Sequence, residues 1–249
     1  MIEHLQPAAL ALAQARHVVV ITGAGVSAES GIRTFRDTME GLWKDFDPAK
    51  LATPEAFATD PATVTRWYDW RRLGCLAAEP NPGHVALAKL EAWLGETNRA
   101  FTLLTQNVDR LHHKAGSRNV IELHGSIIEW RCTRTGRKST PPNTPFDEFP
   151  PRSEAGAPLR PDVVWFGEAL PQPALDAAEH AMHTCDLFMS VGTSSVVYPA
   201  AGFAELARYR GAPVIEVNPA PTALTRTATW SLRGKSGQIL PHLLGTAMA

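Results

Sequence analysis

Short apolar runs alternate along the chain with segments in which apolar residues recur at helical spacing. Residues 17–25 form a β-branched run that ends in glycines, which predicts a buried strand followed by a tight turn. Further strands are predicted over residues 101–107, 119–125, 187–192 and 214–218, and helices over residues 5–16, 81–96, 198–211 and 236–244. Strands that alternate with helices indicate an α/β fold, with a mostly parallel sheet covered on both faces.

Two segments break this alternation. Residues 38–80 are rich in aromatic residues and proline and contain no strand-like run, which indicates a helical insertion. Residues 127–162 lose apolar periodicity, and five prolines gather between residues 141 and 151. This second segment is predicted to be a loop-rich module.

Composition and net charge limit the classes of protein to which this sequence can belong. The 249 residues carry a formal net charge of −1, which argues against nucleic-acid binding driven by bulk charge. The N-terminus lacks the basic start and apolar run of a signal peptide, and no segment approaches the roughly 20 apolar residues of a membrane span. With three widely spaced cysteines, we expect a cytoplasmic protein without nucleic-acid or membrane partners. A monomer is favoured, and the sequence leaves the oligomeric state open.

The stretch GAGVSA (23–28) follows the first predicted strand and satisfies the G-x-G-x-x-G/A dinucleotide pattern. Its glycines allow a tight turn in which backbone N–H groups approach a diphosphate. The acidic residue that usually closes a second strand about 20 residues later is missing, so a standard dehydrogenase arrangement is not favoured. Tight glycine turns are common, so the motif alone is a weak signal.

Polar side chains follow several other predicted strands. Gln106, Asn107 and Asp109 come directly after one strand, His124 ends the next, and SVGTSS (190–195) closes a third. Ligands of parallel sheets gather at the carboxyl ends of the strands, so these groups suit a ribose, a carboxamide or a phosphate. The structural alternative makes Asn107 or Asp109 a helix N-cap and leaves His124 as a packed side chain.

The stretch RWYDWRR (66–72) contains Tyr68 and Arg71, which share one face if the segment is helical. A phenol and a guanidinium directed at one point form a receptor for a carboxylate. The simpler interpretation is a solvated amphipathic helix with Trp67 and Trp70 turned inward.

Six stretches together resemble the sirtuins, the NAD-dependent protein-lysine deacylases. They are GAGVSAESGIRTFR (23–36), TQNVDRLHHKAG (105–116), ELHGS (122–126), VVWFGE (163–168), GTSS (192–195) and VN (217–218), in the family's order. The resemblance implies a Rossmann-like NAD-binding domain of residues 1–37, 81–126 and 163–249, with a smaller domain formed by two insertions. Residues 38–80 would be the helical insertion with the acyl pocket, and residues 127–162 the loop-rich module.

The resemblance also implies the site residues. Those assigned to NAD are Gly23, Ala24, Gly25, Ser27, Phe35, Arg36, Gln106, Asn107, Asp109, Gly192, Ser194, Asn218 and Ser236. His124 would be the general base and would act with Asn107, taking a proton from the ribose diol after the acyl oxygen has displaced nicotinamide. The products would be free lysine, nicotinamide and O-acyl-ADP-ribose.

The acyl and peptide sites follow from the same resemblance. In the desuccinylase-like class III branch, a Tyr-x-x-Arg pair binds the distal carboxylate of the acyl group, and a preceding alanine widens the pocket. Ala52, Tyr68 and Arg71 match these three residues, which implies a preference for succinyl-, malonyl- or glutaryl-lysine with deacetylation retained. The segment from Trp165 through Phe166 and Gly167 to Glu168 would pair with the acylated protein as an added strand.

The sequence departs from the family at its structural zinc, which two pairs of cysteines usually hold. Cys132 matches one ligand, Thr135 replaces the next, and no cysteine lies around residues 150–153. We therefore predict no zinc. Two rival interpretations remain. The first is a different reaction at the same site, either NAD hydrolysis or protein ADP-ribosyl transfer. The second is a non-catalytic module that binds NAD or acyl-lysine.

Overall fold

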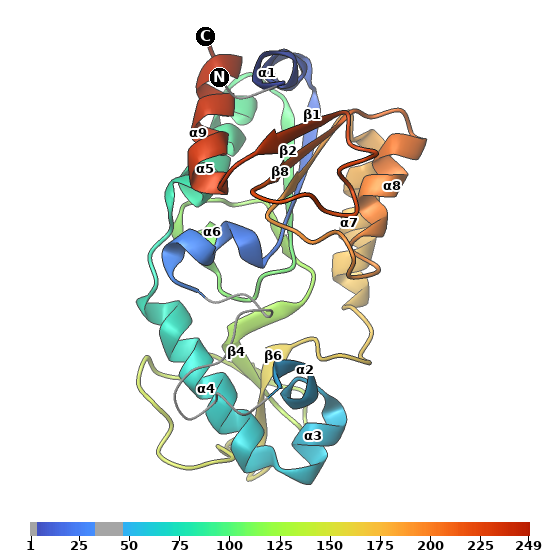
Figure 1. Ribbon diagram of the computed structural model, residues 1–249. Helices are drawn as coiled ribbons and strands as arrows, with labels where there is room; N and C mark the ends of the chain where they lie inside the picture. Colours follow the sequence, from blue (N-terminus) through green and yellow to red (C-terminus); the bar gives the residue numbers. More distant parts are fainter. Residues whose placement is uncertain (1–3, 33–46) are drawn as a thin grey trace.

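The structure is a computed structural model that describes residues 4–32 and 47–249. Within this part of the chain, six parallel strands form the main sheet in the order β3-β2-β1-β7-β8-β9 (Figure 1). The strands are β1 His17–Thr22, β2 Ala100–Thr105, β3 Val120–Glu122, β7 Leu187–Val191, β8 Val214–Asn218 and β9 Trp230–Arg233. The predicted α/β fold with a parallel, Rossmann-like sheet is confirmed.

The central strand β1 is buried on both faces, which explains its uninterrupted apolar sequence. Val18 and Val20 pack toward one face and Val19 and Ile21 toward the other. The helices on the first face are α1 Leu5–Gln14, α5 Pro82–Glu96 and α9 Ser236–Ala247. The second face is covered by α7 Gln172–Thr184 and α8 Gly202–Tyr209. The sequence analysis did not predict α7 or β9.

The described part of the helical insertion contains α2 Pro48–Leu51, α3 Pro54–Thr59 and α4 Pro61–Ala77. Helix α4 begins where Asp60 accepts a hydrogen bond from Thr63 N at 3.0 Å, with Pro61 in the first turn. Tyr68 and Arg71 therefore lie on a helix, as the predicted helical insertion required for them to share a face. Its buried face joins a third apolar cluster, which includes Trp67, Tyr68 and Trp130.

A second sheet lies below the first in Figure 1 and packs against α4. Its antiparallel strands are β4 Gly125–Cys132, β5 Lys138–Ser139 and β6 Leu159–Val163, in the order β5-β4-β6. The sequence analysis treated this region as loop-rich and missed β4 and β6. Between these two strands the chain is mostly loop, as its prolines indicated.

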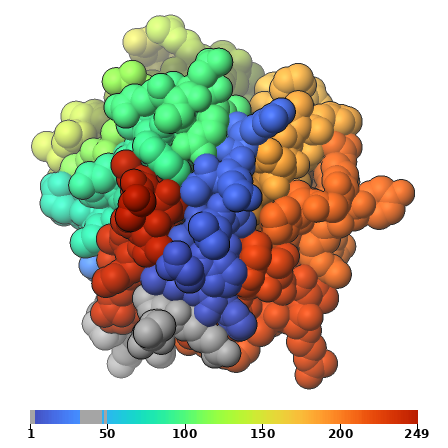
Figure 2. Space-filling view, turned by 90° about the horizontal axis from the view of Figure 1, so that it is seen from above, coloured from blue at the N-terminus to red at the C-terminus, as the bar shows by residue number. Residues whose placement is uncertain are grey.

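The two ends of the described chain meet on one face. Figure 2 shows α1 beside α9, whose side chains share the same apolar cluster. No helix in the described ranges is both long and apolar enough to cross a membrane.

Candidate functional site

The glycine turn after β1 packs directly against the end of β7. Gly23 N donates to Val191 O at 3.1 Å, and Gly25 N donates to Gly192 O at 2.9 Å. A Cβ on Gly25 would lie 2.8 Å from Gly192 O, and a Cβ on Gly192 would lie 2.5 Å from Val26 N. Gly192 also has a φ of +62°. Only glycines permit this approach, which brings backbone from two strand ends to one place at the carboxyl edge of the sheet.

The turn continues as two short 3₁₀ segments, η1 Ala24–Val26 and η2 Ala28–Ser30, with buried Ser27 between them. Ser27 Oγ donates to Asp109 Oδ2 at 2.7 Å and accepts a hydrogen bond from Asn107 Nδ2 at 3.1 Å. Asp109 Oδ1 accepts a hydrogen bond from Leu111 N, at the start of α6 Leu111–Lys114. Burial raises the pKa of Asp109, which these hydrogen bonds and the positive charge of Arg71 oppose. Two separate motifs therefore form one buried polar cluster.

His124 lies between β3 and β4, where the chain passes from the first sheet to the second. Its Nδ1 is 2.9 Å from Gln106 O. Because a carbonyl oxygen only accepts, Nδ1 carries the proton and Nε2 keeps its lone pair. Burial lowers the pKa of His124, and the hydrogen bond to Gln106 partly opposes this effect. At neutral pH the ring is thus a neutral base.

The edge of the sheet continues to β8 and α9. Asn218 Nδ2 donates to Thr193 O at 2.7 Å, which joins the loop after β7 to the end of β8. Ser194 is half-buried in that loop. Ser236 begins α9, and within the described chain its buried hydroxyl has no hydrogen-bond partner. Phe35 and Arg36 lie outside the described residues.

Helix α4 carries Tyr68 and Arg71 side by side. Tyr68 is 3% exposed, and burial raises its pKa to about 12, so the phenol stays protonated at neutral pH. The half-buried guanidinium of Arg71 lies 4.7 Å from the ring centre of Trp67 and 5.6 Å from that of Tyr68. The charge of Arg71 partly opposes the raised pKa of Asp109.

Trp165, after β6, closes the other side of this region. Its ring centre lies 6.2 Å from that of Tyr68 and 5.3 Å from that of Phe57. Phe166 N donates to the carbonyl of buried Ala52 at 2.9 Å, while the Phe166 side chain is exposed. The fold therefore brings Ala52, Tyr68 and the segment at 165–166 together from three separate parts of the sequence.

Comparison with known proteins agrees with this geometry. Residues 23–199 match the model of the Sir2 family. An NAD-dependent protein deacylase of Methylococcus capsulatus is 52% identical, covering 94% of this chain and 93% of its own length. NAD-dependent protein deacylase 1 of Pseudomonas aeruginosa is 51% identical, covering 95% and 96%.

A solved Sir2 homologue in complex with NAD superposes with a TM-score of 0.87 at 44% identity, covering 96% of this chain and 92% of its own. The chain belongs to the Sir2 family. It is an enzyme of the sirtuin class, and the family predicted from its motifs is confirmed.

The sirtuin segment predicted to pair with a peptide is already held within the chain. Glu168 binds Arg160 at 2.7 Å and accepts a hydrogen bond from Trp165 N at 2.9 Å, while Glu168 N donates to Trp165 O. Gly167 turns the chain with a φ of +87°. Pairing with an added strand therefore stays a prediction, and it would use Gly167 N–H and the remaining carbonyl groups rather than these N–H groups.

The zinc that the sirtuin family implies has no suitable donor set here. Cys132 is buried at the end of β4 and accepts a hydrogen bond from Ser153 Oγ at 3.2 Å. The hydroxyls of Ser153 and Thr135 lower the pKa of the Cys132 thiol to about 6. Among the described residues, no three His, Cys, Asp or Glu side chains are grouped to hold a metal ion. One thiol among hydroxyls does not fit zinc, and the absence of zinc in the protein stays a prediction.

Sequence reasoning missed two buried groups that support the sirtuin site. His84 Nε2 lies 3.3 Å from Ser27 Oγ, and its ring lies 4.8 Å from that of His112. Burial lowers the pKa of His84 to about 4. Glu216 on β8 binds Arg233 at 3.0 Å and accepts hydrogen bonds from the hydroxyls of Thr225, in the following loop, and Ser231, on β9. The sequence offers one sign of a buried role for Glu216, because it is a charged residue inside an otherwise apolar strand.

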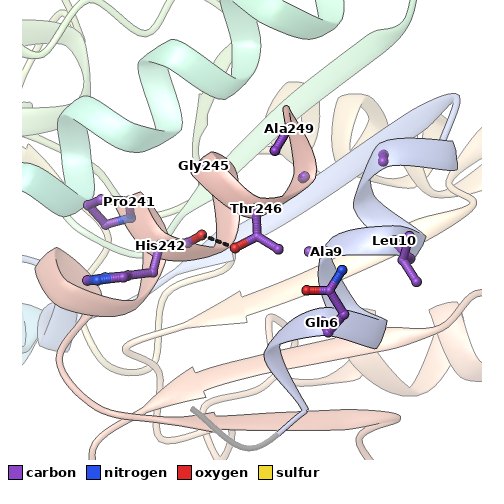
Figure 3. A pocket seen from close by; sticks show the side chains of 10 residues that line it. Gln6, Ala9, Leu10, Pro241, His242, Gly245, Thr246 and Ala249 are labelled. Atoms are coloured by element: carbon purple, nitrogen blue, oxygen red, sulfur yellow. Dashed lines mark hydrogen bonds between the residues drawn. The ribbon is translucent and has the colours of Figure 1, made fainter. Parts of the chain in front are cut away.

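A hollow of about 740 Å³ lies elsewhere, between α1 and the C-terminal half of α9 (Figure 3). Gln6, Ala9 and Leu10 line it from α1, and Pro241 and His242 line it from α9. None of the described residues that line this hollow is assigned to NAD, to the acyl group or to catalysis.

Proposed function

We propose that this sirtuin removes acyl groups from lysine side chains of proteins with NAD, releasing nicotinamide and O-acyl-ADP-ribose. Acidic acyl groups such as succinyl or malonyl are the preferred substrates, and deacetylation is retained. The observation that carries the acyl preference is the pairing of Tyr68, buried beside Trp165, with the half-buried Arg71, whose guanidinium lies 5.6 Å from the ring centre of Tyr68. The names of the similar deacylases support the reaction class.

The residues at the sheet edge fit a dinucleotide. Gly25 and Gly192 let the turn after β1 pack against the end of β7, and the N–H groups of Gly23 and Gly25 are used in that packing. A diphosphate would lie against this compact backbone at the carboxyl edge of the sheet. Asn218 lies at the end of β8 for the adenosine ribose, and Asn107 and Asp109 lie on the nicotinamide side. Bound NAD supplies an anomeric carbon whose bond to cationic nicotinamide breaks readily.

His124 then moves one proton. Gln106 O accepts the hydrogen bond of Nδ1–H, so Nε2 is the nitrogen that would accept the proton of the ribose diol. Because burial lowers its pKa, the ring is ready to accept a proton at pH 7. A positioned general base typically contributes about 10²- to 10⁴-fold to the rate. Ser27 keeps Asn107 and Asp109 in place through its two hydrogen bonds.

The acyl pocket offers one fixed positive charge and one phenol that stays protonated. A hydrogen bond to a charged group contributes about 1.5–3 kcal/mol net, which is about 10- to 100-fold in kcat/KM. An acetyl group gives Arg71 no carboxylate to bind, so a site built for that hydrogen bond discriminates against it. The pair thus favours an acyl chain that ends in a carboxylate.

The test is steady-state deacylation of one peptide that carries acetyl-, succinyl- or glutaryl-lysine, for wild type and Arg71→Met. We expect kcat/KM to favour the acidic acyl groups and this preference to collapse in the variant. Arg118→Met is a matched control, because Arg118 is exposed in the loop between α6 and β3 and is assigned to no site. Acetyl preference with no effect of Arg71→Met would refute the acyl assignment. ADP-ribose released without any acyl-lysine would favour NAD hydrolysis instead.

A further inference from the structure

Helix α4 carries a second pair with the same spacing, shifted by one residue. Tyr68 and Arg71 form the first pair, and Asp69 and Arg72 form the second. One helical step is a rotation of about 100°, so the two pairs lie on adjacent faces of the same turn. What holds the second face therefore sets the direction of the first.

The second pair is buried and fully engaged. Arg72 is 0% exposed, and its Nη2 lies 2.6 Å from Asp69 Oδ1. The guanidinium also donates to the carbonyls of Pro142 and Thr144, each at 2.7 Å. Asp69 Oδ2 accepts a hydrogen bond from Phe146 N at 3.1 Å. Two side chains of one helix thus hold three backbone groups of residues 142–146, which run alongside α4 (Figure 1).

The held segment is itself anchored to the second sheet. The ring of Phe146 lies 4.8 Å from that of Trp130 on β4, and the Arg72 guanidinium lies 5.1 Å from the Phe146 ring. A buried ion pair is tolerated only with good geometry and further hydrogen bonds, so this arrangement allows little rotation of α4. These contacts hold the proline-rich segment in place, and no group of described residues is arranged to hold it through a metal ion.

We propose that Asp69 and Arg72 are positioning residues for the acyl pocket. They fix the rotation of α4 and so direct Tyr68 and Arg71 at the acyl chain without touching it. A helix with its side chains has a radius of about 5–6 Å, so a rotation of about 20° moves a side-chain tip by about 2 Å. Displacements of about 1 Å at a reacting centre can change rates by about 100-fold. This proposal rests on the acyl preference proposed above.

The experiment compares wild type, Arg71→Met and the double variant Asp69→Leu/Arg72→Met. The double variant removes both charges together, so it leaves no uncompensated buried charge. For each protein, kcat/KM is measured with succinyl- and acetyl-lysine on one peptide, and KM is measured for NAD. The ratio of the two kcat/KM values does not depend on how much of the sample is folded. We expect this ratio to fall about tenfold in the double variant, with KM for NAD within about twofold of wild type.

Two further variants keep the test decisive. Leu12→Ala creates a cavity under α1, far from α4, and should lower Tm while leaving the ratio unchanged. Arg72→Lys retains the charge but reaches fewer of the acceptors, so it should give an intermediate ratio, and it carries the test if the double variant does not fold.

The outcomes separate the two proposals. A wild-type ratio in the double variant and in Arg72→Lys, with the ratio lost in Arg71→Met, would overturn the positioning role alone. A wild type without acidic-acyl preference, unchanged by Arg71→Met, would overturn the acyl preference and the positioning role with it.

Discussion

The close approach of Gly192 to the glycine turn gives the sharpest stability prediction. In Gly192→Ala the new Cβ would meet Val26 N at 2.5 Å, and the residue would keep a φ of +62°. A left-handed backbone costs about 1–2 kcal/mol for a residue with a Cβ. Overpacking against backbone costs about 1–3 kcal/mol more. We therefore expect the free energy of unfolding to fall by about 2–5 kcal/mol.

The control is Gly211→Ala. Gly211 has a φ of +81°, and a Cβ there would have no atom within 4 Å, so this variant carries only the backbone strain of about 1–2 kcal/mol. Each kcal/mol shifts Tm by about 2–4 °C in a protein of this size. Calorimetry should thus show a clearly larger loss of Tm for Gly192→Ala.

NAD affinity separates the two variants further. Titration calorimetry should find weaker NAD binding in Gly192→Ala, because the shifted strand ends form the proposed diphosphate site, and wild-type affinity in Gly211→Ala. Equal losses of Tm together with unchanged NAD affinity in both variants would refute the reasoning.

Three further predictions concern titration and metal. His124→Ala should lower kcat about 10²- to 10⁴-fold. In the wild type, kcat/KM should fall on the acid side only below pH 6.5, because burial lowers the pKa of His124. A fall that begins above pH 6.5 would contradict this. His84 and His112 are neutral when folded, so below pH 6.5 the unfolded chain binds protons that the folded chain does not. Urea unfolding should therefore show that the free energy of unfolding falls by about 1.4 kcal/mol per pH unit for each of these histidines as the pH drops below 6.5. The contribution of His84 should level off near pH 4. A free energy of unfolding that does not change over this range would contradict the prediction. Purified protein should contain no stoichiometric zinc by mass spectrometry, and EDTA should leave Tm unchanged; one zinc per chain would disprove this.

That several polar groups share one edge of the sheet could be predicted, because parallel strands end at a common edge. The rule puts Ser27, Asn107 and Asp109 at the same edge of the sheet. The strand order of the structure then brings them into contact, although 80 residues separate Ser27 from Asn107. The hydrogen bonds among them could not be predicted, since they depend on how deeply the turn after β1 packs against β7. Nor could the tautomer of His124, which is set by the carbonyl of Gln106.

The helical insertion shows the other limit. The spacing of Tyr68 and Arg71 predicted a shared face, because that face follows from helix geometry alone. Asp69 and Arg72 have the same spacing and read equally well as a solvated pair. Their burial depends on Pro142 and Thr144, about 70 residues away in the sequence. The prolines of that segment predicted loop, so the flanking strands β4 and β6 were not predicted either.

The position of β1 between β2 and β7 has a consequence for how the chain folds. Its neighbours in the sheet are residues 100–105 and 187–191, so this buried strand is synthesised long before the strands that pair with it. Closing such long loops is entropically costly, and sheets of this kind fold slowly. A nascent chain that has reached α5 would expose β1 without either neighbour. We therefore expect truncated chains that end before residue 187 to aggregate, and chaperones to matter more for this protein than for a sheet of hairpins.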